Sequence, residues 1–138
     1  MNIRRIEHEF LLYRMSAAEL EDIQAELEGL KSYDRPKTGE GKKAGVPDVA
    51  DQVIARDRRK EELQTKAKTI RRRRKAVEAA LRQYKKHEYI DAVKRIYVQG
   101  QSVRLVAKDM RRDWRTVDRH ARQLLCQMGE IICKVGNL

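Results

Sequence analysis

Residues 48–86 constrain the fold most, because this long stretch contains neither glycine nor proline and is rich in good helix formers. An uninterrupted stretch of this kind predicts one helix about 57 Å long, at about 1.5 Å per residue. Its apolar residues have heptad spacing, which is typical of a helix that packs lengthwise against a partner helix. These residues are Leu63, Ala67, Ile70, Val77, Leu81 and Tyr84, and Arg74 interrupts the series.

The partner is predicted in residues 1–31, where apolar side chains recur three and four positions apart. Ser16 and Glu19 have the spacing of a capping box, so the segment is interpreted as one amphipathic helix or as a helix pair. Residues 32–47 contain both prolines and three of the seven glycines, which predicts a flexible linker. Residues 1–31 have a net charge of −3 and residues 48–86 have +8, so we expect an antiparallel, coiled-coil-like hairpin.

No run of Val, Ile and Thr alternates with polar residues, so we expect an all-α protein without a sheet. The formal net charge of +11 favours a polyanionic partner such as nucleic acid. The longest apolar run, residues 10–13, is too short to span a bilayer, and the first residues do not resemble a leader peptide. We therefore expect a cytoplasmic protein that has no membrane contact.

Residues 87–138 differ in character from the preceding helix, because short predicted helices replace the long one. Tyr89 begins a first helix that ends near Gly100, a residue type common at helix C-termini. Ser102 is a favourable N-cap for a short second helix. After a tight turn, Asp113 is the expected N-cap of a third helix, and Arg111 takes the place where such a turn often has glycine. The small core is predicted to contain Val106, Ala107, Met110, Val117 and Leu124.

This pattern predicts a helix-turn-helix whose third helix enters the major groove of double-stranded DNA, where guanidinium groups can bind guanine O6 and N7. The side chains on the outer side of this helix are Arg115, Asp118, Arg119 and Arg122. A second group at its N-terminal end, suited to phosphate contacts, consists of Arg111, Arg112 and Thr116. Trp114 is counted among the DNA-facing residues, although capping the small core is the favoured role for its ring.

The segment IYVQGQSVRLVAKDMRRDWRTVDRHARQLL resembles the helix-turn-helix of sigma-factor region four. The layout of acidic helix, Pro/Gly linker, long charged helix and this module resembles the phage-encoded transcriptional regulators of the RinA and ArpU type. The resemblance implies a sequence-specific DNA-binding protein, an activator of late phage genes in the bacterial host. It also implies recognition positions at Arg115, Thr116, Arg119 and Arg122.

Two competing functions stay open at this point. A DNA-packaging subunit of the small-terminase kind also joins a helix-turn-helix to an oligomerising helical region. A helical interaction module that binds acidic proteins would need no DNA. The three histidines are isolated and no nucleophile–base pattern is present, so we expect neither an enzyme nor a metal site nor a cofactor.

The run Arg71–Lys75 points around its helix, so only two or three of its cations could face one partner. It is interpreted as a solvated face, as a strip that binds phosphates, or as a surface for an acidic protein such as an RNA polymerase subunit. We favour supporting phosphate contacts from Arg71, Arg72, Arg73 and Lys75.

The apolar stripe of the third helix continues to Val135, beyond what the small core needs. It is expected to pack either on the chain's own hairpin or on a second subunit, which leaves open a homodimer through the hairpin or the C-terminal helix. Cys126 and Cys133 are seven residues apart and cannot pair within one helix, so they are interpreted as packing residues.

Overall fold

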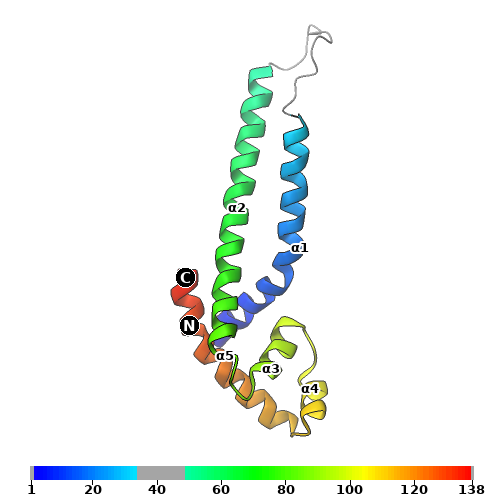
Figure 1. Cartoon of the computed structure of the whole chain (residues 1–138), viewed down its shortest axis with the longest axis vertical. Coiled ribbons are helices and arrows are strands. Elements are labelled where there is room, and N and C mark those ends of the chain that lie inside the picture. The colour runs from blue at the N-terminus through cyan, green and yellow to red at the C-terminus, as the bar shows by residue number, and fades with distance from the viewer. Residues whose placement is uncertain (1, 34–48, 138) are drawn as a thin grey trace. The chain divides into compact units, whose positions relative to one another are not determined.

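The computed structural model describes residues 2–33 and 49–137, and all regular structure in these two ranges is helical. The expected all-α class is therefore confirmed. The expected linker at residues 32–47 lies almost wholly outside the described residues. The helices are α1 (Ile3–Tyr33), α2 (Val49–Gln83), α3 (Ile90–Val93), the π-helical turn η1 (Lys94–Val98), α4 (Val103–Met110) and α5 (Trp114–Gly136) (Figure 1).

The chain divides into two compact units, and both α1 and α2 contribute to each of them. One unit, here called the basic unit, combines Met1–Ala17 with Arg71–Leu138. It contains 21 lysines and arginines against nine aspartates and glutamates. The other, the balanced unit, is Ala18–Ile70, with 11 cationic against 12 acidic residues. The entire excess of positive charge thus belongs to the basic unit, which also contains the expected boundary between residues 86 and 87.

In the balanced unit, α1 and α2 lie against each other and run in opposite directions. Glu19 pairs with Lys66 at 3.1 Å, whereas Glu26, further along α1, pairs with Arg59, earlier in α2, at 2.8 Å. Between these ion pairs a small apolar core is buried. It consists of Ile23, Leu63 and Ala67, with Leu20, Leu27, Leu30 and Ile70 packed against it.

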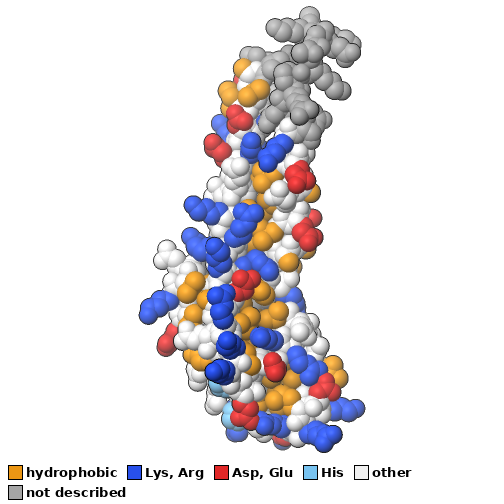
Figure 2. Space-filling view, in the orientation of Figure 1, with side chains coloured by type: hydrophobic (Ala, Val, Ile, Leu, Met, Phe, Trp, Pro, Cys, Tyr) orange, Lys and Arg blue, Asp and Glu red, His pale blue; other side chains and the backbone are white. Residues whose placement is uncertain are grey.

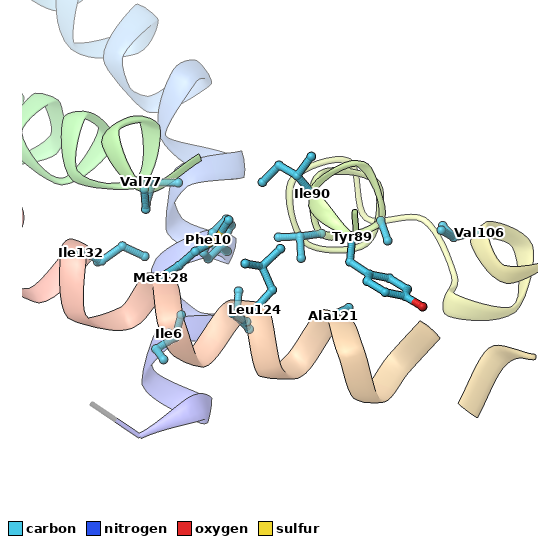
Figure 3. Packing of buried hydrophobic residues seen from close by; sticks show 14 of the residues in the cluster. Ile6, Phe10, Val77, Tyr89, Ile90, Val106, Ala121, Leu124, Met128 and Ile132 are labelled. Carbon is cyan, nitrogen blue, oxygen red and sulfur yellow. The ribbon is translucent and has the colours of Figure 1, made fainter. Parts of the chain in front are cut away.

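The core of the basic unit joins the first turns of α1 and the end of α2 to the helices that follow them (Figure 3). Ile6 and Phe10 of α1 and Val77 of α2 are buried together with Met128 and Ile132 of α5. The apolar stripe of α5 therefore packs on the chain's own helices. Of the core residues expected around the turn, Val106, Ala107, Val117 and Leu124 are buried, and Met110 is half-buried against them.

The structure assigns residues 3–33 to one helix, α1, in which Ser16 is an interior residue and not an N-cap. The hydroxyl of Ser16 donates to the carbonyl of Tyr13 at 2.9 Å and accepts a hydrogen bond from Arg74 Nη1 at 2.6 Å. The same Nη1 donates to Tyr13 O at 2.9 Å, and the Arg74 guanidinium lies 4.4 Å from the centre of the Tyr13 ring. The arginine that interrupts the heptad series is thus bonded to α1.

Gly100, between η1 and α4, has a φ of +73°, in the left-handed region that residues with a Cβ avoid. We expect Gly100→Ala to lower the free energy of unfolding by about 1–2 kcal/mol, the cost of this backbone conformation for an L-residue. A Cβ here would also lie 2.2 Å from Arg14 Nη1, so that flexible side chain would have to move. Urea unfolding checks the value. Gly100→Asn is the control, because asparagine tolerates the left-handed region better than alanine, and equal losses for both variants would contradict the backbone explanation.

Candidate nucleic-acid interface

Helices α4 and α5 are joined by the short turn Arg111–Asp113. Ser102 is the N-cap of α4, as expected, and its Oγ accepts a hydrogen bond from Leu105 N at 3.1 Å. Arg111 has φ 58° and ψ 40°, so the arginine adopts the left-handed conformation that a glycine would provide. This conformation lets Arg112 N donate to Ala107 O at 3.0 Å, which closes the end of α4. Asp113 is the N-cap residue of α5, but its side chain makes no capping hydrogen bond.

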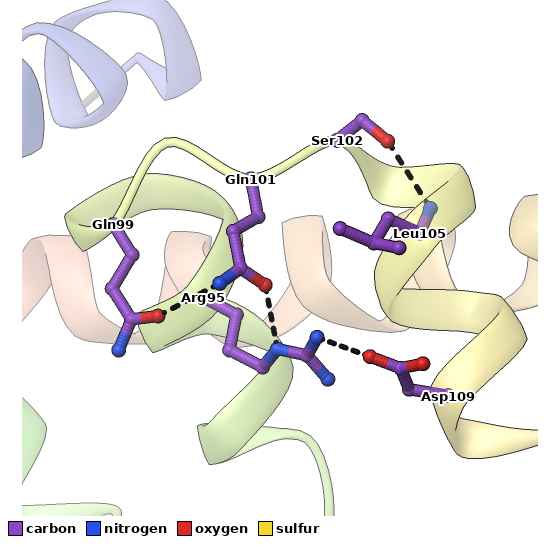
Figure 4. A network of polar contacts seen from close by, with 6 residues as sticks. All are labelled: Arg95, Gln99, Gln101, Ser102, Leu105 and Asp109. Carbon is purple, nitrogen blue, oxygen red and sulfur yellow. Dashed lines mark hydrogen bonds and ion pairs between the residues drawn. The ribbon is translucent and has the colours of Figure 1, made fainter.

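A polar network holds α4 against η1 (Figure 4). Arg95 of η1 donates from Nε to Gln101 Oε1 at 2.7 Å, and its Nη2 forms an ion pair with Asp109 of α4. Gln101 in turn donates to Gln99 at 3.1 Å. Because the guanidinium of Arg95 bonds both to the loop before α4 and to the last turn of α4, it fixes the direction of α4 relative to η1.

The start of α5 is fixed by contacts with the segment before α3. Arg112 pairs with Glu88 at 2.5 Å and donates to the hydroxyl of Tyr89 at 2.6 Å. The hydrogen bond to Glu88 is the main reason that the pKa of Arg112 is raised. The buried Tyr89 ring stacks on His120 of α5, with ring centroids 4.6 Å apart. Arg112, expected among the phosphate contacts, is thus exposed and at the same time bonded to the segment before α3.

The face of α5 opposite the core is cationic. Arg115 and Arg119 are exposed, as is Arg111 in the turn, and within the described ranges none of the three forms an ion pair. Thr116 is half-buried beside them. The described part of the structure therefore leaves these three guanidinium groups without an ion pair: Arg115 and Arg119, four residues apart in the first turns of α5, and Arg111 in the turn before it.

Asp118 and Arg122 lie at the edge of this face. Arg122 Nε forms an ion pair with Asp118 Oδ1 at 3.3 Å, which raises the pKa of the guanidinium. Both residues line an open cavity of about 360 Å³ that reaches Glu7 and Arg14 of α1. Burial, followed by the nearby Glu7 carboxylate, raises the pKa of Tyr97 in this cavity to about 12, so its hydroxyl stays neutral at physiological pH. Arg122 is therefore less available to a partner than Arg115 and Arg119.

Trp114 does not cap the core, contrary to the favoured expectation, because its side chain is 38% exposed. Two guanidinium groups lie near the Trp114 ring: that of Arg104 in α4 is 5.2 Å from the ring centre, and that of Arg115 is 5.6 Å from it. Sequence reasoning missed Arg104 and Lys108, which are both exposed on α4. Their spacing of four residues on the polar side of a short helix was the available signal.

The residues expected to contact phosphates on α2 differ in their exposure. Arg71, Arg72 and Lys75 are exposed. Arg73 is half-buried, and its Nε is buried without a hydrogen-bond partner in the described part of the protein. Arg74 is bonded to α1. Three of the four proposed phosphate contacts are therefore exposed, and Arg73 is the least accessible of the four.

Arg111→Gly is expected to change stability and affinity in opposite directions. Glycine adopts the left-handed conformation without steric cost, so the free energy of unfolding should rise by up to about 1 kcal/mol. Binding to duplex DNA should weaken, because one exposed guanidinium is removed. Thermal unfolding and a fluorescence binding titration measure the two effects. Arg111→Ala is the matched control, expected to weaken binding equally without the gain in stability; unchanged binding in both variants would remove Arg111 from the interface.

Two further features concern the rest of the chain. Neither cysteine is in a disulfide, and Cys126 is exposed on α5, so it is not the packing residue that the sequence predicted. Within the described ranges, every helix is too short or too polar to cross a membrane.

Comparison of the chain with known protein families, with characterised proteins and with solved structures found no match.

Proposed function

We propose that the protein is a sequence-specific double-stranded DNA-binding protein that regulates transcription and reads the major groove with α5. One observation carries the proposal: Arg115 and Arg119 extend, exposed and unpaired, from the first turns of a helix whose start is anchored by Arg112 and Tyr89. In helix-turn-helix proteins, residues near the N-terminal end of the recognition helix contact base edges in the major groove, and Arg115 and Arg119 lie at this end of α5.

The proposed roles follow from position along α5. Arg115 and Arg119 are four residues apart, a rise of about 6 Å, which matches about two base-pair steps of B-DNA. Each guanidinium is suited to bidentate bonding with guanine O6 and N7. Arg111 and Thr116, at the helix N-terminus, are suited to a phosphate, which the helix dipole also favours. Trp114 and Arg104 form the rim of the same surface.

The regulatory role is supported by the resemblance of the sequence to phage regulators of the RinA and ArpU type, and by the concentration of positive charge in the unit that contains α5. In this proposal the protein acts on phage late genes in the bacterial cytoplasm. RNA polymerase is the second partner it would contact, and a homodimer would match a twofold operator.

Selection from a pool of duplexes with a random central region tests the proposal. The protein is incubated with the pool at about 50 mM and about 200 mM salt, and the bound fraction is sequenced. We expect one motif, rich in guanine at two positions, to be enriched at both salt concentrations. Retention without enrichment would mean that the arginines contact phosphates alone, and retention of no duplex would exclude DNA as the partner.

A further inference from the structure

A second cationic surface lies on α2, separate from α5 but in the same basic unit. We call it the α2 stripe and define it as Arg71, Arg72, Lys75 and Arg82, all of them exposed. Arg71, Lys75 and Arg82 follow one another at spacings of four and seven, so they share one face of the helix. The buried residues Ala76, Val77 and Ala80 occupy the opposite face. Figure 2 shows Lys and Arg side chains gathered along this part of the molecule.

The charges of the α2 stripe are not neutralised by the protein. In the balanced unit, Arg59 and Lys66 of the same helix each pair with a glutamate of α1. In the described structure no carboxylate pairs with a residue of the α2 stripe. Glu78, the one acidic residue between positions 71 and 82, lies on the same face as Arg71, Lys75 and Arg82 and leaves the stripe with an excess of cations. Its carboxylate accepts a hydrogen bond from Tyr13 of α1 at 3.2 Å and, among the described residues, forms no ion pair with the stripe. The stripe is therefore a row of accessible cations.

The side chains of this face are better suited to the phosphate groups of a nucleic acid than to an acidic protein. Protein interfaces carry large apolar or aromatic side chains at their centre. Such side chains are exposed at several places in the described part of the molecule, but none of them lies between residues 71 and 83. The stripe spans the twelve residues 71–82, a rise of about 16 Å over eleven steps of about 1.5 Å. A row of charges of this length can contact two or three phosphates of one duplex.

We infer that the α2 stripe binds the phosphate backbone of the duplex beside the site that α5 reads, which rests on the proposed function. Contacts to phosphate carry no sequence information, so the stripe contributes affinity equally for every duplex. It also makes binding more dependent on salt, because each phosphate neutralised releases counterions. The two surfaces thus have different roles: α5 recognises the sequence, and the α2 stripe increases the affinity for any duplex.

The double variant Arg71→Gln/Lys75→Gln tests this inference in the full-length protein. Binding constants are measured for the enriched duplex and for a shuffled duplex over a series of salt concentrations. We expect affinity for both duplexes to fall by the same factor. The slope of log K against log salt should become less steep by about 0.9 for each phosphate that the variant no longer neutralises, or about 1.8 for two. Arg58→Gln/Lys60→Gln, the same charge change on α2 in the balanced unit, should leave the slope unchanged.

An unchanged slope of log K against log salt in the double variant would overturn the inference. This result is expected if the stripe binds an acidic protein instead of DNA. Loss of discrimination with an unchanged slope would also overturn it, because the stripe would then act on sequence readout. The proposed function is tested by a different quantity, the ratio of the wild-type affinities for the enriched and the shuffled duplex. If the proposed function is wrong, this ratio is one, whatever the slopes. Circular dichroism establishes that the variants are folded, as expected for positions outside both apolar cores.

Discussion

Phe10→Ala is expected to lower the free energy of unfolding of the basic unit by about 3–5 kcal/mol. The Phe10 side chain is 0% exposed and is among the largest buried side chains of the protein. Its ring lies 6.1 Å from that of Tyr97 and is buried with Met128 of α5 and Val77 of α2. Truncation would leave a cavity where three helices meet, and a loss of this size is a large fraction of the free energy of unfolding of a typical domain. Chemical denaturation followed by circular dichroism measures the loss.

The neighbouring residue provides the control for this prediction. Leu11 is 39% exposed, so Leu11→Ala should cost less than about 1 kcal/mol although it also truncates an apolar side chain of α1. Equal effects of the two substitutions would mean that the first turns of α1 do not belong to the core around α5. A large loss for Phe10→Ala alone would establish that the N-terminal helix supports the helix proposed to read DNA.

Arg119→Ala is expected to reduce discrimination at one base position of the bound sequence by about 1–3 kcal/mol, or roughly 5- to 150-fold in affinity. The reason is that Arg119 is exposed on the outer face of α5, so its guanidinium is free to bond with guanine O6 and N7. Competition between the enriched duplex and its single-base variants measures the effect. At the position read by Arg119, the variant should no longer distinguish guanine from the other bases.

Lys134→Ala is the matched control, because it removes an exposed cation from the far end of the same helix. It should change affinity slightly and leave the preference at every base unchanged. If Arg119→Ala instead weakens binding to all duplexes by the same factor, Arg119 is a phosphate contact. The role of base reading would then pass to Arg115 alone.

The local pattern of the sequence was sufficient to predict the helices around the proposed interface. Ser102 caps α4 and Gly100 has a positive φ, because capping and left-handed backbone conformations depend on the residue itself. Val106 and Val117 are buried as predicted, since helical spacing fixes which side of a helix faces its neighbour. The helix-turn-helix interpretation of these elements stays a prediction.

The contacts that decide which arginines are available could not be predicted, because they join residues far apart in the sequence. Arg112 stays a predicted DNA contact, and its bonds to Glu88 and Tyr89 join it to a segment more than twenty residues earlier. Arg73 and Arg74 resemble their neighbours in sequence, yet one is half-buried and the other is bonded to Ser16 of α1. Helical periodicity states which side of α2 is apolar, but it does not state which polar group lies opposite each guanidinium.

The ratio of affinities for the enriched duplex and a shuffled duplex of the same composition tests the central claim most directly. It is measured with the wild-type protein at about 50 mM and about 200 mM salt. A sequence-reading α5 predicts a ratio of at least about 10³ that persists at the higher salt concentration, while both affinities fall. A ratio near one at both concentrations, with affinity that collapses as salt rises, would contradict sequence recognition by α5.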